Sequence, residues 1–420
     1  MHRTLNIQPA LCARGAAHLL RCIGVGAALL SPALALAQDD NYAHSDEPIG
    51  TIEEIYDGKL TPDLGVSTFR NIDRLFPSRL IEAGGTVHEL PQSATKFNGF
   101  TVEIDGRTYD YHDFLAVQQI TGLVILKDGE LVHETYQRGN TADTRWMSMS
   151  IAKSVASTLA GIAVNDGHIS SLDALVTDYV PSLKGSAYEG ATVRDILMMS
   201  SGVGWDEQYT DPASDRRALL RAQIAQQPGA AMKVMAALER VAEPGTLNNY
   251  STGETQVLAE VIYHATGTPL AEYLSEKVWK PYGMQADAYW WLDSTDGVEI
   301  GGSGISATLR DFARFGQFIL DGGSVDGQPV VPSSWVAEAT TPRTLKNGET
   351  IQYGYMWWPG WTEAAKADGA YLAMGIYGQN IYINPAKNVI IANTAALPKP
   401  GSPEIGNYLA FFDAIAASLE

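Results

Sequence analysis

The segment Trp146-Met-Ser-Met-Ser-Ile-Ala-Lys-Ser154 decides both the fold and the chemistry that the chain supports. Within it, Ser150 and Lys153 form a Ser-x-x-Lys pair at the start of an apolar stretch. That stretch runs to Val164 with helical spacing and ends near Gly167. Because residues three apart share one face of a helix, the predicted helix places the hydroxyl of Ser150 beside the amine of Lys153.

This pairing is typical of a nucleophile next to a base. A serine hydroxyl is a weak nucleophile unless a base takes its proton. A lysine serves as that base only if burial or neighbouring cations lower its pKa from about 10.4. The amides at the helix start would favour negative charge developing near Ser150. The alternative is a surface serine with a lysine that extends into solvent.

A second Ser-x-x-Lys match occurs at Ser93 and Lys96. It follows Pro91 in a polar stretch, and Asn98-Gly99 lies just beyond it. These neighbours predict a loop, so we assign this match no role.

Two later segments carry further candidate groups. Asn249-Tyr250-Ser-Thr252 precedes a predicted helix, and a tyrosine there can act as general acid or base. Gly375-Ile-Tyr-Gly-Gln379 leads into a predicted strand, where an exposed amide could form an oxyanion hole with the amide of Ser150. The alternatives are a buried tyrosine at a helix cap and a tight entry into a strand.

Strand patterns lie toward both ends of the chain, and helical patterns fill the middle. This order predicts an α/β fold of the α+β type, with an antiparallel sheet flanked by helices and a helical insertion at about 170–299. The predicted strands are Thr101–Ile104, Thr108–Tyr111, Gly122–Lys127, Glu130–Tyr136, Tyr353–Trp358, Gln379–Ile383 and Asn388–Asn393. Beyond the helix at Ser150, helices are predicted from capping boxes at Thr192, Ser251 and Thr308, and at Pro269–Trp279 and Glu404–Leu419.

The N-terminus has the layout of a secretory signal peptide. An apolar run, Ile23–Leu36, follows three arginines, and Ala35-Leu36-Ala37 is typical of a cleavage site. We expect residues 1–37 to be removed after Ala37, which implies export to the periplasm or medium, and no membrane span afterwards. A retained membrane anchor and a mis-assigned start codon are the alternatives. We expect residues 38–99 to form an arm wrapped on the domain, residues 100–420.

Charge and composition exclude several classes of function. The 48 acidic against 29 basic residues give a net charge of −19, which argues against nucleic acid or an anionic membrane as partner. Both cysteines, Cys12 and Cys22, lie in the predicted signal peptide, so no thiol chemistry is expected. The eight histidines form no close pair or zinc motif, and Walker, Rossmann and G-x-S-x-G motifs are absent. We therefore expect no cofactor and no metal; the sequence leaves the oligomeric state open.

Ser150-x-x-Lys153, Tyr250-x-Thr252 and the glycine-rich strand entry, in that order, resemble the serine β-lactamase and penicillin-binding-protein superfamily. Asp195–Gly202, Leu309–Gly316 and Gly378–Pro385 are also similar to this group. Within it, the chain most resembles 6-aminohexanoate-dimer hydrolases and family VIII carboxylesterases, which share the class C β-lactamase fold.

The resemblance implies a role for each matching residue. Ser150 would be the acylated nucleophile, Lys153 would accept its proton, and Tyr250 would pass that proton to the leaving group. The oxyanion hole would be formed by the amides of Ser150 and Ile376. Substrate-binding residues at the pocket would be Tyr209, Ser303 and Gly375.

The departures from the pattern favour an ester or an uncharged amide as substrate. At the third motif, where Lys-Thr-Gly or His-Thr-Gly is usual, this chain has Ala373-Met374-Gly375, and Thr252 stands where Asn is usual. A substrate carboxylate thus loses a charge-assisted contact of about 1.5–3 kcal/mol. We expect a serine hydrolase acting through an acyl-enzyme on a small ester or amide. The alternatives are a β-lactamase or D-alanyl-D-alanine carboxypeptidase, and a non-catalytic binding protein. Tryptophans near these segments could line an apolar acyl pocket or belong to the core; they are Trp146, Trp205, Trp290, Trp291, Trp357 and Trp358.

Overall fold

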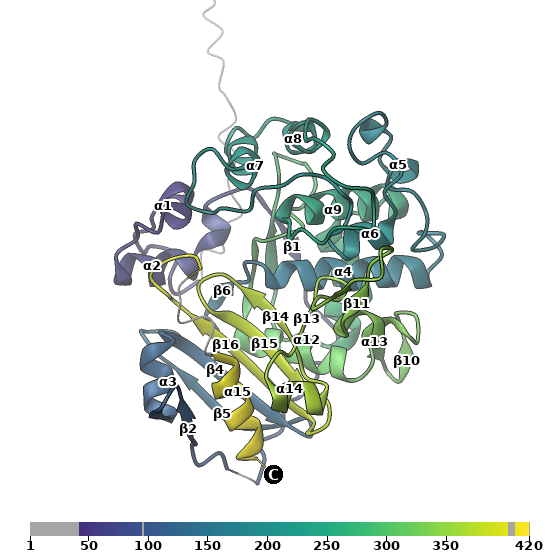
Figure 1. Ribbon diagram of the computed structural model, residues 1–420. Coiled ribbons are helices and arrows are strands. Elements are labelled where there is room, and N and C mark those ends of the chain that lie inside the picture. Colours follow the sequence, from purple (N-terminus) through teal and green to yellow (C-terminus); the bar gives the residue numbers. More distant parts are fainter. Residues whose placement is uncertain (1–41, 95, 402–407, 420) are drawn as a thin grey trace, which may run out of the picture. The chain divides into compact units, whose positions relative to one another are not determined.

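The structure is a computed structural model that describes residues 42–94, 96–401 and 408–419. The predicted signal peptide, residues 1–37, lies outside these ranges. Figure 1 shows the described elements in chain order, from α1 to α15.

A six-stranded antiparallel sheet is built from segments far apart in the sequence (Figure 1). Inside this sheet, an early strand, β4, pairs with a late strand, β16, and Ile125 lies opposite Ile391. This pairing confirms the predicted antiparallel sheet. In spatial order the strands are β13 (Trp358–Pro359), β14 (Tyr371–Gly375), β15 (Gln379–Asn384), β16 (Val389–Ala395), β4 (Ile120–Lys127) and β5 (Glu130–Tyr136).

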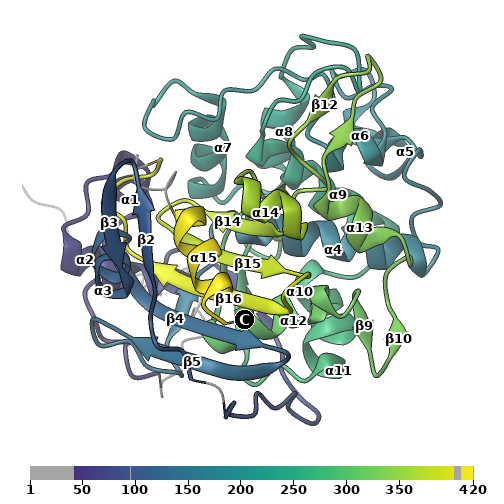
Figure 2. The same cartoon turned by 60° about the horizontal axis from the view of Figure 1, so that its bottom comes forward.

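Side chains alternate along β4 and supply two separate cores. Val124 belongs to the core that includes helix α12 (Leu309–Leu320), and Leu123 belongs to the core under helix α15 (Tyr408–Ala417). Figure 2 shows α15 lying over the strands on one side of the sheet. Because both faces are covered, β4 is apolar on both sides, as its continuous hydrophobic sequence predicts.

The hairpin between β4 and β5 turns at Asp128-Gly129, a residue pair that favours a two-residue turn. Asp128 and Gly129 both have positive φ, 53° and 80°. Two such residues form a type I′ turn, whose twist matches that of the flanking strands. The hairpin is therefore defined locally.

A second, four-stranded sheet is not predicted by the sequence pattern. Its edge strand β1 comes from the N-terminal arm, and Ser78 lies opposite Trp291. The same sheet leads directly into the candidate site, because β6 ends just before Ser150. In spatial order its strands are β1 (Ser78–Ile81), β7 (Ala288–Trp291), β8 (Ile305–Thr308) and β6 (Arg145–Met147).

The middle of the chain is mostly helical, with two differences from expectation. Strand β7 lies within the range 170–299, and the helical turns after Pro269 continue past Pro281 to Gly283, which has φ 83°. Pro281 is tolerated because it stands in the first turn of its helix, where a missing N–H costs little. The helices are α4 (Ile151–Asn165), α5 (Val176–Tyr179), α6 (Val193–Leu197), α7 (Asp215–Ile224), α8 (Ala230–Ala236), α9 (Thr252–Thr266), α10 (Leu270–Leu274), the π-helix η3 (Ser275–Trp279) and α11 (Lys280–Tyr282). In the described ranges, no helix combines the length and the apolar character needed to cross a bilayer.

Shorter elements complete the described chain. The expected strand Tyr353–Trp358 is wrong except at Trp358: Gly354 packs against the carbonyl of Ala339, and Met356 has φ 59°, so this buried segment is irregular. Strand β14 was not expected. The remaining elements are α1 (Ile52–Asp57), α2 (Pro62–Phe69), the 3-10 helices Ile72–Arg74 and Pro181–Leu183, β2 (Thr101–Ile104), β3 (Arg107–Asp110), α3 (Tyr111–Val117), β9 (Ser324–Val325), β10 (Gln328–Pro329), α13 (Trp335–Thr340), β11 (Arg343–Thr344), β12 (Thr350–Ile351) and α14 (Glu363–Asp368).

Of the three predicted capping boxes, only the one at Thr192 is complete. Ser251 accepts a hydrogen bond from the amide of Glu254, but the Glu254 carboxylate accepts from Ser201 instead of returning to the cap. Thr308 caps α12, while the carboxylate of Asp311 accepts from backbone amides of the loop after α11. In both helices, the acidic side chain therefore bonds to a distant segment and not to the backbone amide of its own cap residue.

Candidate active site

Ser150 lies at the N-terminus of α4, immediately after a strained residue. Met149 is buried and has φ 41°, in the left-handed region, while Ser150 is right-handed with φ −71°. The preceding residue, Ser148, exchanges hydrogen bonds with Ile305 of β8, at 2.8 and 3.0 Å. The second sheet therefore holds the backbone that presents Ser150, and strain is stored directly beside the candidate nucleophile.

Lys153 is buried one helical turn from Ser150, as the three-residue spacing predicts. Its Nζ lies 2.8 Å from Oγ of Ser150 and donates to the carbonyl of Gly302 at 2.9 Å. The side chain is 1% exposed. Burial lowers the pKa of Lys153 to about 7, so a large fraction of the amine is neutral near neutral pH and can accept a proton.

Tyr250 faces the same pair from the segment just before α9. It lines the same cavity as Ser150, whose hydroxyl acts on the pKa of the phenol, and its ring centroid lies 5.4 Å from Nζ of Lys153. Burial raises the pKa of Tyr250 well above its ordinary value, and the charge of Glu207 acts in the same direction. The phenol therefore keeps its proton at neutral pH and is poised to donate it.

The turn Gly375–Gly378 comes close to the nucleophile. A Cβ on Gly375 would lie 2.5 Å from the carbonyl oxygen of Ser148, so only glycine fits at the end of β14. The turn closes through the amide of Gly378 donating to the carbonyl of Gly375 at 3.2 Å. Among the described residues, the amides of Ser150 and Ile376 donate to no protein acceptor. Both amides are thus free to receive an oxyanion.

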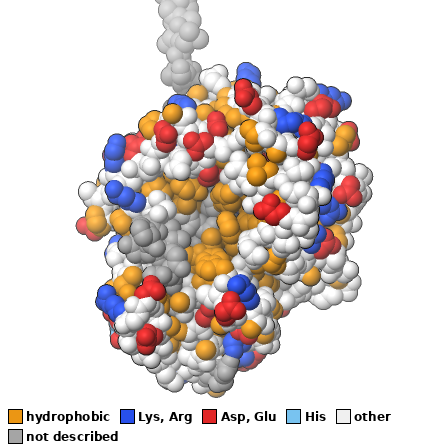
Figure 3. Space-filling model, viewed as in Figure 1, with side chains coloured by type: hydrophobic (Ala, Val, Ile, Leu, Met, Phe, Trp, Pro, Cys, Tyr) orange, Lys and Arg blue, Asp and Glu red, His pale blue; other side chains and the backbone are white. Residues whose placement is uncertain are grey.

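A cavity of about 230 Å³ opens over these groups. Figure 3 shows the hollow, lined by hydrophobic side chains, where Figure 1 places β14 and the start of α4. An apolar cavity with few polar groups is typical of a small-molecule site. The described lining residues are Ser150, Tyr209, Tyr250, Trp358, Met374, Gly375, Ile376, Gly378, Asn380 and Tyr408.

The structure brings most predicted site residues to this cavity, but not all. Ser303 is buried, is not among the described lining residues, and its hydroxyl has no hydrogen-bond partner among the described residues. It stands behind Lys153, next to Gly302, because the turn at 301–304 packs inward against the nucleophile helix. Of the six tryptophans named from the sequence, only Trp358 is among the described lining residues, and the other five are buried in the core.

Two charged residues near the site were not found from the sequence. The carboxylate of Glu207 accepts from the amide of Thr252 at 2.9 Å, from its hydroxyl, and from the indole of Trp205. Arg216, in the first turn of α7, is 3% exposed. The sequence offered no signal for either, since Glu207 lies in the loop before α7 and Arg216 at the start of α7, and only the fold brings this segment beside α9.

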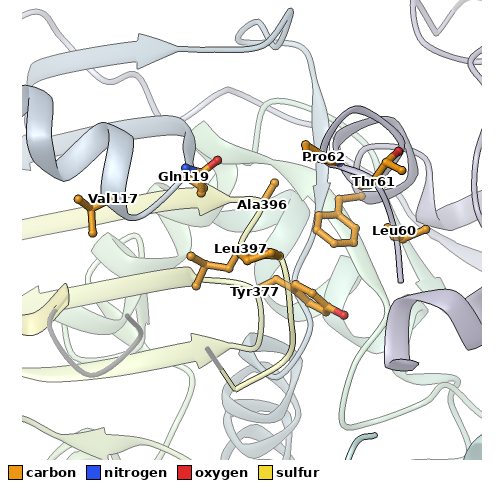
Figure 4. Close-up of a pocket in the computed structure, with 11 residues that line it drawn as sticks. Leu60, Thr61, Pro62, Val117, Gln119, Tyr377, Ala396 and Leu397 are labelled. Carbon is orange, nitrogen blue, oxygen red and sulfur yellow. The ribbon is translucent and has the colours of Figure 1, made fainter. Parts of the chain in front are cut away.

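A second cavity, of about 250 Å³, borders the same turn. Figure 4 shows Tyr377 and Leu397 on its wall with Leu60 and Pro62 from the N-terminal arm. The hydroxyl of Tyr377 donates to the carbonyl of Ile55. The N-terminal arm therefore supports the turn that carries the amide of Ile376.

The sequence profile of the β-lactamase family matches residues 112–414. The chain belongs to the β-lactamase family. Together with the site geometry, this membership makes it a serine hydrolase. In the part of the chain that the structure describes, no three His, Cys, Asp or Glu side chains gather as metal ligands.

Relatives and solved structures agree with this family. The 6-aminohexanoate-dimer hydrolase of Paenarthrobacter ureafaciens is 31% identical over 291 residues, covering 66% of this chain and 72% of that protein. A structure from Bacillus anthracis, provisionally assigned as a 6-aminohexanoate-dimer hydrolase, superposes with a TM-score of 0.73 at 24% identity, covering 84% of this chain and 92% of that chain. A family VIII carboxylesterase gives a TM-score of 0.54 at 19% identity, covering 70% and 91% of the two chains. The two structures share the β-lactamase fold predicted from the sequence.

Proposed function

We propose that this protein hydrolyses small esters or amides through an acyl-enzyme formed on Ser150. The observation that carries the proposal is the 2.8 Å separation between Oγ of Ser150 and the buried Nζ of Lys153. A hydroxyl alone would not react at neutral pH, but a neutral amine at this distance takes its proton.

In the acylation step, neutral Lys153 accepts the proton of Ser150 while Oγ attacks the substrate carbonyl carbon. The carbonyl π electrons move to oxygen, and the amides of Ser150 and Ile376 stabilise the resulting oxyanion. The tetrahedral intermediate then collapses, and the bond to the leaving group breaks.

Tyr250 completes the proton transfer in this proposal. As the leaving group departs, the phenol donates its proton to that group and takes a proton from the neighbouring Lys153 ammonium, so that Lys153 becomes neutral again. Water then attacks the acyl-enzyme with the same groups in reverse, which releases the acid and restores the serine. The raised pKa of Tyr250 supports a role as a proton donor rather than a standing phenolate.

The cavity favours esters and amides with apolar groups. Met374, Trp358 and Ile376 offer apolar surface beside the nucleophile, and β14 carries no cation at 373–375. The 6-aminohexanoate-dimer hydrolase relative supports linear amides as one substrate class. A β-lactamase or D-alanyl-D-alanine carboxypeptidase activity remains the enzymatic alternative, disfavoured by the missing cation.

A substrate panel on the purified protein tests this proposal. We expect kcat/KM for short p-nitrophenyl esters, or for the 6-aminohexanoate dimer, to exceed that for nitrocefin. Ser150→Ala should abolish turnover, while Ser93→Ala, in the other Ser-x-x-Lys match, should leave it unchanged. Nitrocefin turnover well above ester and amide turnover would reverse the ranking, and binding of these compounds without any turnover would point to a binding protein.

We also propose that the protein is exported after cleavage behind Ala37. The support is the charged, apolar and small-residue layout of residues 1–37. N-terminal sequencing of protein from the periplasm or medium should begin at Gln38. A mature protein that retains residues 1–37 would contradict cleavage.

A further inference from the structure

Arg216 is a buried cation whose charge is not matched by a neighbouring carboxylate. Among the described residues, no carboxylate oxygen lies within 4.0 Å of its guanidinium, whereas Nη1 of the adjacent Arg217 lies 2.7 Å from Asp57. Burying an unpaired charge is costly, and buried arginines are normally paired. Such a cation is a candidate for binding an anionic ligand.

The guanidinium of Arg216 makes one hydrogen bond to a described residue, which leaves most of its N–H donors without a protein acceptor among the described residues. One guanidinium nitrogen donates to the hydroxyl of Tyr56, and the guanidinium carbon lies 4.4 Å from the centroid of that ring. No other hydrogen bond from the guanidinium is made to a described residue. The side chain is 3% exposed and is not among the described residues that line the catalytic cavity, so a ligand would reach its free donors past Tyr209. A guanidinium has five N–H donors in a fork that fits a carboxylate.

Arg216 lies one aromatic ring behind the wall of the catalytic cavity. The ring of Tyr56 is 6.3 Å from the ring of Tyr209, and Tyr209 lines the cavity together with Ser150. The amide of Arg216 donates to the carbonyl of Asp206 at 3.0 Å, which fixes the start of α7 against the loop that carries Tyr209. The charge of Arg216 also acts on Lys153 and Tyr250, where it lowers the pKa of each.

The neighbouring anion does not neutralise Arg216 directly. Glu207 is held toward α9 by the amide and hydroxyl of Thr252 and by the indole of Trp205. On the opposite side of the nucleophile, the end of β14 has no cation, since residues 373–375 are Ala-Met-Gly. Among the described residues near the nucleophile, Arg216 is therefore the cation available to a ligand, because Lys153 is committed to Ser150 and Gly302.

We propose that Arg216 binds a free carboxylate of the substrate, so that the enzyme selects esters or amides that carry an anionic end group. This inference rests on the proposed ester or amide hydrolysis at Ser150. Tyr56 positions the guanidinium through its hydroxyl and ring, and Tyr209 separates it from the reacting carbonyl. This cation lies on the helical side rather than on β14, so the carboxylate that it would bind occupies a different position from one held beside β14.

Two pairs of chromogenic substrates test the proposal. In the first, the carboxylate is on the acyl group: p-nitrophenyl monoesters of succinate, glutarate and adipate are compared with p-nitrophenyl butanoate. In the second pair, the carboxylate is on the leaving group. The butanoyl ester of 4-hydroxybenzoate is compared with the butanoyl ester of methyl 4-hydroxybenzoate, which is neutral. Each pair gives a ratio of kcat/KM, anionic over neutral, and the pair with the larger ratio identifies the position of the carboxylate.

We expect at least one anionic ester to be preferred by wild type, and its ratio to fall at least tenfold in Arg216→Gln, mainly through KM. Arg216→Lys should recover part of the ratio. Arg221→Gln is the matched control, because Arg221 lies on the same helix, is exposed and contacts only the carbonyl of Pro212 among the described residues. It should leave the ratio within about twofold of wild type.

The wild-type ratios themselves provide a test that does not rely on the folding of a variant. Ratios near one in both pairs, or an unchanged ratio in Arg216→Gln, would overturn the carboxylate proposal while ester turnover persists. Loss of all turnover in wild type would instead contradict the proposed function.

Discussion

Nζ of Lys153 lies 2.8 Å from Oγ of Ser150 and 2.9 Å from the carbonyl oxygen of Gly302, enclosed by protein on all sides. The position is unfavourable for an ammonium ion and favourable for a neutral amine. Burial, the largest influence, brings the pKa of Lys153 to about 7. The pair is therefore set up as nucleophile and base.

The pH dependence of turnover should follow Lys153. Because the neutral amine is the base, kcat/KM for an ester should rise with pH up to about 7 and then level off. Tyr250 should not limit the plateau below about pH 10, because its pKa is raised. Initial rates between pH 5 and 9.5 measure the profile. A flat or falling profile between pH 5 and 7 would contradict Lys153 as base.

Lys153→Met should inactivate the protein and stabilise it. We expect kcat to fall by at least about 10³-fold, since the base is lost. A lysine whose pKa is lowered on folding binds fewer protons in the folded than in the unfolded state between about pH 7 and 10, so wild-type stability rises with pH in that window.

The substitution should remove this pH slope. It should also raise the free energy of unfolding at pH 7 by about 1 kcal/mol, because the cost of deprotonating a buried lysine disappears and outweighs the two hydrogen bonds that are lost. Urea unfolding at pH 7 and 9.5 measures both effects. An equal slope in the variant would show that Lys153 is not the buried titrating group.

Tyr250→Phe should lower kcat by about 10²–10⁴-fold, because the leaving group loses its proton donor. Amides, whose amine leaving groups need that proton, should suffer more than p-nitrophenyl esters. Tyr353→Phe is the matched control: the two rings are 6.0 Å apart, but the Tyr353 hydroxyl has no partner among the described residues. Equal losses in both variants would mean that Tyr250 acts only by packing.

Gly375→Ala should reduce turnover more than it reduces stability. The new Cβ would meet the carbonyl of Ser148 at 2.5 Å, so β14 must move away from the nucleophile, and the amide of Ile376 moves with it. We expect at least about a 10²-fold loss in kcat, comparable to the loss of an oxyanion donor. Gly84→Ala is the control, since its Cβ would find its nearest neighbour at 3.7 Å. Kinetics near wild type in Gly375→Ala would place the oxyanion hole elsewhere.

Glu254 should make the protein less stable as the pH rises. Burial raises the pKa of this carboxyl to about 8, so the folded state keeps a proton that the unfolded chain releases. Its contribution to stability is complete below about pH 4.3 and is lost progressively up to about pH 8. Glu254→Gln should flatten this dependence in urea unfolding, while the exposed Glu349→Gln should not. A wild-type-like slope in Glu254→Gln would contradict the assignment.

The parts of the candidate site that depend on residues close together in the sequence were predictable from the sequence. The helix at Ser150 shows its 3.6-residue period in the sequence, so the Ser150–Lys153 contact follows from three-residue spacing alone. The turn of the β4–β5 hairpin is likewise specified by Asp128 and Gly129. Such features need no knowledge of the rest of the chain.

Features that depend on distant pairing were missed. Strand β1 pairs with β7 across more than 200 residues, and its short sequence has no alternation that distinguishes it from a loop. Glu207 and Arg216 come to the site only because the loop between α6 and α7 folds over α9. Ser303 was misplaced for the same reason: a glycine-rich turn can face a pocket or pack behind it, and only tertiary packing decides which.

Covalent labelling of Ser150 tests the central claim most directly. Purified protein is treated with a fluorophosphonate at neutral pH, and its intact mass and labelled peptide are determined. We predict one adduct per chain, on Ser150, with labelling lost in Ser150→Ala, strongly slowed in Lys153→Met and unchanged in Ser93→Ala. Absence of an adduct on the wild-type protein, or an adduct that persists in Ser150→Ala, would contradict the account.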